Sequence, residues 1–188
     1  MMISAVFDAC ILYPAVLRDF LFRLADNGLI DPFWSNEIQN EWTHSLLRKQ
    51  PELKRENLER TCREMSLHYP NGLVRGYESI TPTLTLPDPK DRHVLAVAIY
   101  AKAEYIVTFN LRDFPKTTLQ PYGIQVLSPD EFALRLIHDE PYHVLVAVRK
   151  HRLSLKRPPK TVAEYLATLE KQGLPKTIAF LREHEADI

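Results

Sequence analysis

The stretch from Leu86 to Phe114, LPDPKDRHVLAVAIYAKAEYIVTFNLRDF, decides the fold of this chain. Asp88 and Asp91 stand at the start of a segment whose apolar residues recur with helical spacing. A short hydrophobic strand follows at Tyr105–Phe109, and Asp113 comes just after it. The stretch therefore predicts a helix and a strand with carboxylates on both sides of the unit.

The alternation of strands and helices continues outward from this stretch. We expect strands at Ile3–Phe7, Phe33–Trp34, Tyr105–Phe109 and Ile124–Leu127, with one or two more in the loop-rich segment 71–87. We expect helices from Pro14 to Asn27, from Ser35 to Pro51, from Leu53 to Leu67, from Asp88 to Ala103 and from the capping box at Ser128 to Ile137. This order predicts an α/β fold in which helices flank a parallel sheet.

The alternation stops at Glu140-Pro141, so we divide the chain into residues 1–140 and a helical C-terminal extension, residues 141–188. In the extension we expect helices at 141–151, 161–173 and 174–184, with a basic linker at 152–160. Residues 1–140 carry 15 Lys and Arg against 19 Asp and Glu, whereas residues 141–188 carry 9 against 5. The formal net charge of zero thus hides an acidic body and a basic extension.

Composition excludes several classes of site. The two cysteines and seven histidines show no CxxC or HExxH spacing, which argues against zinc and against a disulfide framework. The chain has no GxSxG, Walker A or GxGxxG motif, and only five glycines. No apolar run reaches membrane-spanning length, so we expect no membrane association and a cytoplasmic location.

Each acid near a predicted strand or helix end has an ordinary explanation when taken alone. Asp8 could close an Asx turn, Glu41 could lie on a solvated helix face, and Asp113 could be a loop acid. Asp88 could be the N-cap of the next helix, with Asp91 in its first turn. These explanations stay open at the level of the sequence.

Considered together, the acids indicate a shared site, because they come from separate segments around one predicted sheet. Ligands bind at the carboxyl ends of parallel strands, and Asp8 and Asp113 both follow strands. Mg²⁺ and Mn²⁺ prefer a few hard oxygen ligands, and phosphodiester hydrolysis uses such ions to orient water and stabilise charge. The pattern favours a divalent-metal site that acts on phosphodiesters.

Four segments carry a family resemblance: VFDAC at 6–10, SNEIQNE at 35–41, DPKDRHVLAVA at 88–98 and IVTFNLRDF at 106–114. Together they resemble PIN domains, in particular VapC-type toxins of bacterial toxin-antitoxin systems, over about residues 3–137. The resemblance implies a PIN-like α/β fold and an endoribonuclease that depends on Mg²⁺ or Mn²⁺. It also implies RNA as substrate and inhibition by a small cognate antitoxin protein; a homodimer is left open.

Carried over by position, the resemblance implies that Asp8, Glu41 and Asp91 are the principal catalytic and metal-binding acids and Asp113 the fourth. Auxiliary roles fall to Asp88, Thr108 and Asn110: Thr108 resembles a hydroxyl residue that holds a carboxylate or water. Asn110 stands where many relatives have aspartate, so either Asp113 replaces that acid or a second metal is weakly held.

The extension from Pro141 also resembles a helical region found on a subset of such toxins. Its cations either contact RNA phosphates or are merely solvated; they are Arg149, Lys150, Arg152, Lys156, Arg157 and Lys160. The apolar residues of its last two helices favour docking against the body. The competing function is a noncatalytic PIN-like module that binds RNA or another partner. A haloacid-dehalogenase-like phosphatase does not fit, because Cys10 stands where its second acid is needed.

Overall fold

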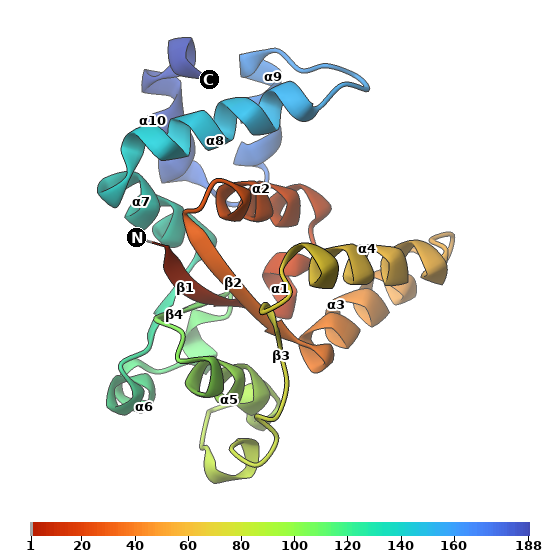
Figure 1. Ribbon diagram of the computed structural model, residues 1–188, viewed down its shortest axis with the longest axis vertical. Coiled ribbons are helices and arrows are strands. Elements are labelled where there is room, and N and C mark those ends of the chain that lie inside the picture. Colours follow the sequence, from red (N-terminus) through yellow and green to blue (C-terminus); the bar gives the residue numbers. More distant parts are fainter. Residues whose placement is uncertain (1) are drawn as a thin grey trace.

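The computed structural model describes residues 2–188, and its centre is a five-stranded parallel sheet (Figure 1). The strands are β1 (Ile3–Phe7), β2 (Ile30–Ser35), β3 (Leu73–Val74), β4 (Tyr105–Val107) and β5 (Gln125–Leu127). Their order is β3-β2-β1-β4-β5, so the crossovers place β1 in the middle. Val6 of β1 lies opposite Phe33 on one side and Ile106 on the other.

Helices cover both faces of the sheet. They are α1 (Ala9–Leu12), α2 (Ala15–Asp26), α3 (Asn36–Lys49), α4 (Arg55–His68), α5 (Arg92–Ala101), α6 (Lys116–Leu119), α7 (Pro129–Asp139), α8 (Pro141–Ser154), α9 (Val162–Glu170) and α10 (Pro175–Glu183). Short 3-10 turns lie at Thr81–Thr83, Pro89–Asp91, Leu111–Asp113, Gln120–Tyr122 and Glu185–Asp187. Figure 1 shows α5 on one side of the sheet and α2 with α7 on the other. The predicted parallel sheet with flanking helices is confirmed.

Apolar burial explains why the central strands hold their places. Ala5, Val6 and Phe7 of β1 are fully buried, and so are Ile106 and Val107 of β4. Strands that are buried on both faces read as continuous hydrophobic runs, as these do. The sheet is therefore a rigid platform for residues that follow β1 and β4.

Several boundaries differ from those expected. The predicted helix from Asp88 to Ala103 is a 3-10 turn, Pro89–Asp91, followed by α5, which ends at Ala101 because Lys102 turns left-handed at φ 54°. The predicted strand Tyr105–Phe109 ends at Val107. The one-turn helices α1 and α6 were not expected, since neither is long enough to show helical periodicity.

The C-terminal helices pack on the body. α8 contacts α2 and α7, α9 contacts α2, and α10 contacts α7. Asp130 in the first turn of α7 accepts hydrogen bonds from the backbone N–H groups of Lys176 and Thr177, at 3.1 and 2.8 Å, which ties the start of α10 to α7. The capping boxes predicted at Ser128 and Thr161 are confirmed. Within residues 2–188 no helix is both long and apolar enough to cross a membrane.

Candidate active site

Acidic side chains from separate elements meet in one open cleft at the carboxyl ends of β1 and β4. The cleft has a volume of about 690 Å³. Its lining includes five of the residues expected from the sequence, namely Asp8, Glu41, Asp88, Asp91 and Asn110. Asp113 is not among the lining residues, although its charge acts on Asp91. Residues that are up to 102 positions apart in the chain therefore share one site.

Asp8 is the most firmly held of these acids. It follows β1 directly, it is only 5% exposed, and its Oδ1 accepts a 2.6 Å hydrogen bond from the backbone N–H of Ala9. Its Oδ2 accepts hydrogen bonds from the Thr108 hydroxyl at 2.6 Å and from the Cys10 thiol at 3.2 Å. Burial raises the pKa of Asp8, and these hydrogen bonds oppose the rise. Asp8 thus caps α1 and also presents a fixed carboxylate to the cleft.

Asp88 and Asp91 separate into two roles. Asp88 caps the 3-10 turn, because its Oδ1 accepts a 2.9 Å hydrogen bond from the backbone N–H of Lys90. Asp91 stands at the N-cap of α5, yet its side chain makes no capping hydrogen bond there. Burial raises the pKa of Asp91 to about 6, assisted by the charges of Asp8, Asp113 and Asp88. Capping therefore explains the position of Asp88, but it does not explain the Asp91 carboxylate, which forms no capping hydrogen bond.

Glu41 is positioned by a residue that the sequence did not reveal. His93 in the first turn of α5 is 3% exposed, and its Nε2 lies 2.9 Å from Glu41 Oε1. Its Nδ1 lies 3.7 Å from Glu37 Oε2, and Glu37 in turn accepts a hydrogen bond from the Tyr77 hydroxyl. Burial lowers the pKa of His93, but the hydrogen bond and charge of Glu41 outweigh it, so the net pKa is raised. The contact with His93 Nε2 holds Glu41 at the cleft wall.

Thr108 and Asn110 complete the end of β4. Thr108 is fully buried, and its hydroxyl accepts a 3.0 Å hydrogen bond from the backbone N–H of Asn110 while donating to Asp8. The structure therefore places Asn110, and not Asp113, in the lining of the cleft. Asp113 lies in the next 3-10 turn, where it acts on Asp91 by charge alone.

Cys10 is a second residue whose place the sequence did not show. Its thiol lies between Asp8 and Thr108, and it accepts a 3.3 Å hydrogen bond from the backbone N–H of Phe109. Burial, with the nearby charge of Asp8, raises the pKa of Cys10 to about 12. The group stays a neutral thiol that donates to Asp8, and its only signal in the sequence is its spacing of two from that acid.

The donor chemistry of the cleft fits a hard divalent cation. Asp8, Glu41, Asp88 and Asp91 offer carboxylate oxygens, and the Cys10 thiol is held protonated; His44 and Asn110 also line the cleft. Among residues 2–188, no three His, Cys, Asp or Glu side chains already form a closed metal-binding group. Mg²⁺ commonly takes only one or two carboxylates and completes its shell with water and substrate phosphate. An open set of acids in which neighbouring carboxylates help to raise the pKa of Asp8 and of Asp91 is compatible with that mode.

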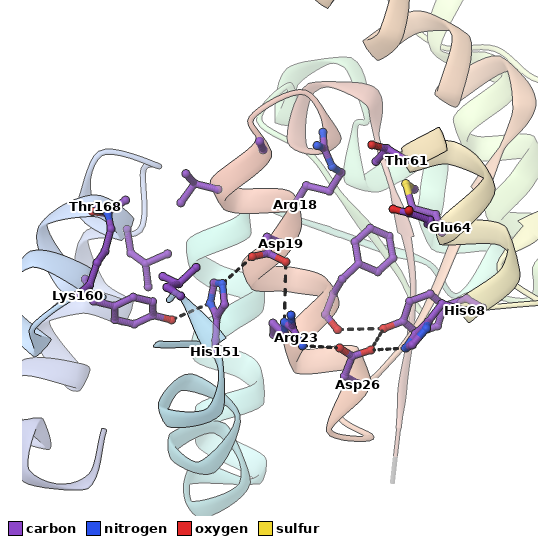
Figure 2. A pocket seen from close by; sticks show the side chains of 18 residues that line it. Arg18, Asp19, Arg23, Asp26, Thr61, Glu64, His68, His151, Lys160 and Thr168 are labelled. Carbon is purple, nitrogen blue, oxygen red and sulfur yellow. Dashed lines mark hydrogen bonds and ion pairs between the residues drawn. The ribbon is translucent and has the colours of Figure 1, made fainter. Parts of the chain in front are cut away.

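A second cavity of about 640 Å³ lies between α2, α4 and the C-terminal helices (Figure 2). Its three acids are already paired: Asp19 lies 2.9 Å from His151 Nε2, Asp26 lies 3.1 Å from His68 Nε2, and Glu64 lies 3.8 Å from Arg60 Nε. Arg23 bridges Asp19 and Asp26, as the dashed lines of Figure 2 show. The acids of this cavity are thus engaged in ion pairs within the protein, at the interface between the body and the extension. The acid-lined cleft is therefore the stronger candidate for the active site.

Comparison with known proteins agrees with this geometry. A family model described as "PIN domain" matches residues 4–112, more than half of the chain. The chain belongs to the PIN domain family. A second model, described as "VapC50 C-terminal domain", matches residues 129–183 of this PIN protein. The family resemblance inferred from the four sequence segments is therefore confirmed.

One relative extends the comparison beyond the family. A protein of Mycobacterium tuberculosis (strain ATCC 25618 / H37Rv) named "Putative ribonuclease VapC50" is 46% identical over 69 residues. The matched segment covers 35% of this PIN protein and 40% of that relative, so the match spans less than half of either chain. No solved structure matches the chain.

Proposed function

We propose that this PIN protein is a cytoplasmic endoribonuclease that depends on Mg²⁺ or Mn²⁺ and serves as the toxin of a toxin-antitoxin pair. The observation that carries the proposal is the convergence of Asp8, Glu41 and Asp91 in one cleft, where Asp91 has no capping role. Membership of the PIN family and the name of the mycobacterial relative support the same reaction class.

In this proposal residues 1–140 form the nuclease unit, and Asp8, Glu41 and Asp91 hold the ion. Asp113 adds charge as the fourth acid, and Asp88 is auxiliary. A divalent ion bound there supplies activation of water and neutralisation of phosphate charge. The chain supplies fixed geometry: Thr108 and the Ala9 N–H hold Asp8, and His93 holds Glu41. Residues 141–188 are proposed as the extension that covers α2 and α7.

The direct test is cleavage of RNA by the purified protein. We expect cleavage with Mn²⁺ or Mg²⁺ and none once EDTA is added, because phosphate charge is otherwise uncompensated among these acids. The same metals should raise the melting temperature, since an ion bound only by the folded state stabilises it by mass action. Metal-independent cleavage, or no melting shift at millimolar metal, contradicts the proposed metal site.

One observation favours a different function. Asn110 lines the cleft where an acid would strengthen metal binding. A noncatalytic PIN-like module that binds RNA or another partner would tolerate such a residue. The two functions separate in one measurement, because the module binds RNA under saturating Mn²⁺ without cleaving it.

The second partner in the proposal is a small antitoxin protein that places an Arg or Lys side chain among the acids. Clustered carboxylates without metal repel one another and attract such a cation. Co-expression with the neighbouring small open reading frame is expected to give a complex that survives purification, whereas the chain alone is expected to be toxic to its host. Harmless expression of the wild-type chain alone contradicts the toxin assignment.

A further inference from the structure

One face of α3 forms part of the wall of the acid-lined cleft. Glu41, His44, Ser45 and Arg48 line the cleft and are spaced three, four and seven residues apart, so they stand on the same side of the helix. Lys49 lines it as well. With a rise of 1.5 Å per residue, Arg48 lies roughly 10 Å along the helix from Glu41. The wall therefore runs from an acidic end to a basic end.

The cations at the basic end are available to a ligand. Arg48 and Lys49 are exposed, and neither takes part in an ion pair between the residues that the structure describes. In the extension, Lys150 donates to Asn27 Oδ1 at 2.8 Å and Arg152 donates to the Lys160 carbonyl at 3.1 Å. Arg149, Lys156 and Arg157 of the extension are exposed as well, but they do not line the acid-lined cleft. Neutralisation of phosphates by free Lys and Arg side chains dominates nucleic-acid affinity. The cleft offers this chemistry beside the acids.

An aromatic ring lies at the same end of the cleft. Tyr13 closes α1, is partly buried and lines the cleft, and Lys49 Nζ lies 5.1 Å from the centre of its ring. Aromatic side chains beside cations bind single strands by stacking unpaired bases while the cations follow the phosphates. Bases inside a duplex cannot make this contact unless they are splayed out.

We propose that Tyr13, Arg48 and Lys49 form a binding subsite for single-stranded RNA that flanks the bond to be cut. Arg48 and Lys49 contact phosphates, and one base stacks on Tyr13. The acidic end then faces the scissile phosphate, and the strand runs along α3 and not over the basic extension. This subsite rests on the proposed ribonuclease function, but binding can be measured without cleavage.

The first measurement is the salt dependence of binding. Fluorescein-labelled oligouridylate is titrated with the protein in EDTA at several KCl concentrations. The double variant Arg48→Ala with Lys49→Ala is expected to reduce the slope of log K against log salt by about 1.4, or about 0.7 for each lost phosphate contact. The matched control, Arg149→Ala with Lys156→Ala, removes two exposed cations of the extension and is expected to leave the slope unchanged. The reverse pattern places the RNA on the extension and overturns the proposal.

The second measurement concerns the ring. Tyr13→Leu is expected to weaken binding of the single strand about 5- to 140-fold, which corresponds to the loss of one stacked base, while Tyr13→Phe keeps the affinity. Wild-type protein is expected to bind an oligouridylate-oligoadenylate duplex more weakly than the single strand. Equal affinity for the duplex, or unchanged affinity in Tyr13→Leu, overturns the stacking contact. The melting temperature of each variant shows whether it is folded. If Tyr13→Leu is unstable, the double variant at the exposed Arg48 and Lys49 still tests the subsite.

The subsite and the proposed function fail in different ways. Metal-dependent cleavage together with an unaltered salt slope in the Arg48 and Lys49 variant refutes the subsite alone. Binding that depends on Tyr13, Arg48 and Lys49 without any cleavage under Mn²⁺ supports the subsite and refutes the nuclease.

Discussion

Asp91→Asn is expected to reduce RNA cleavage by about a thousandfold or more. An ion that polarises a phosphoryl oxygen contributes several kcal/mol to the transition state, and asparagine is a far poorer ligand for a hard cation than aspartate. The substitution keeps the shape of the side chain, and no capping hydrogen bond of α5 depends on the carboxylate. Cleavage rates under saturating Mn²⁺ measure the effect.

The matched control is Asp88→Asn. Asp88 lines the same cleft, but its carboxylate caps the turn Pro89–Asp91, a role that asparagine fills about as well. We therefore expect a much smaller loss of activity, whereas Asp8→Asn should resemble Asp91→Asn. Near wild-type cleavage by Asp91→Asn would falsify the assignment of the metal ligands.

The same variant has an expected signature in stability. The pKa of Asp91 is raised from 3.8 to about 6, so the folded, metal-free protein binds a proton there more tightly than the unfolded chain does. Ionised Asp91 therefore costs stability, and the cost grows as pH rises from about 4 to about 6 and is constant above that range. Asp91→Asn removes the cost, which we put at no more than about 1 kcal/mol because the group is partly exposed and screened.

The measurement is the difference in melting temperature between Asp91→Asn and wild type, in EDTA, across pH. The variant is expected to be as stable or more stable at pH 7, and the difference should vanish near pH 4. A variant that is less stable at pH 7 would show that the Asp91 carboxylate has a structural role after all.

The fold could be predicted where the signal is local. The capping boxes at Ser128 and Thr161 predict the starts of their helices, and each box involves residues only three positions apart. Short hydrophobic runs likewise predict the strands β1, β4 and β5 from local sequence alone. Such features need no knowledge of the rest of the chain.

The extent of β2 could not be predicted, because Pro32 lies inside it. The sequence suggested a strand only at Phe33–Trp34, whereas β2 spans Ile30–Ser35. The backbone N–H of Trp34 donates to Gly72 on the side of β3, and in a strand residue 32 faces the same side. β3 pairs only with Trp34 and Ser35, so the missing N–H of Pro32 interrupts no ladder bond.

The acids of the candidate site were visible in the sequence, but their supports were not. His93 looks like one more residue of an apolar helix face, and its partner Glu41 is 52 positions away. Tyr13, Arg48 and Lys49 likewise belong to no local motif; only the packing of α1 against α3 brings them together. Contacts between distant segments depend on topology, which single residues do not encode.

The second large effect is expected from Leu169→Ala, which should lower the free energy of unfolding of the whole protein by about 2–5 kcal/mol. Leu169 of α9 is fully buried, and α9 packs against α2 of the body. α8 begins at Pro141, directly after α7, so no flexible linker separates the extension from the body. Truncation of this buried side chain leaves a cavity in the core that the body and the extension share, so both parts are destabilised.

Urea denaturation followed by circular dichroism measures the effect, with Leu153→Ala as the matched control. Leu153 of α8 is 55% exposed, so its truncation is expected to change stability by no more than about 0.5 kcal/mol. We expect one cooperative transition for each variant, with the midpoint of Leu169→Ala shifted for the body and the extension alike. Two transitions, of which only one moves, would show that residues 141–188 unfold on their own. In that case the extension would be an appended unit, and the body would not need it as a cover.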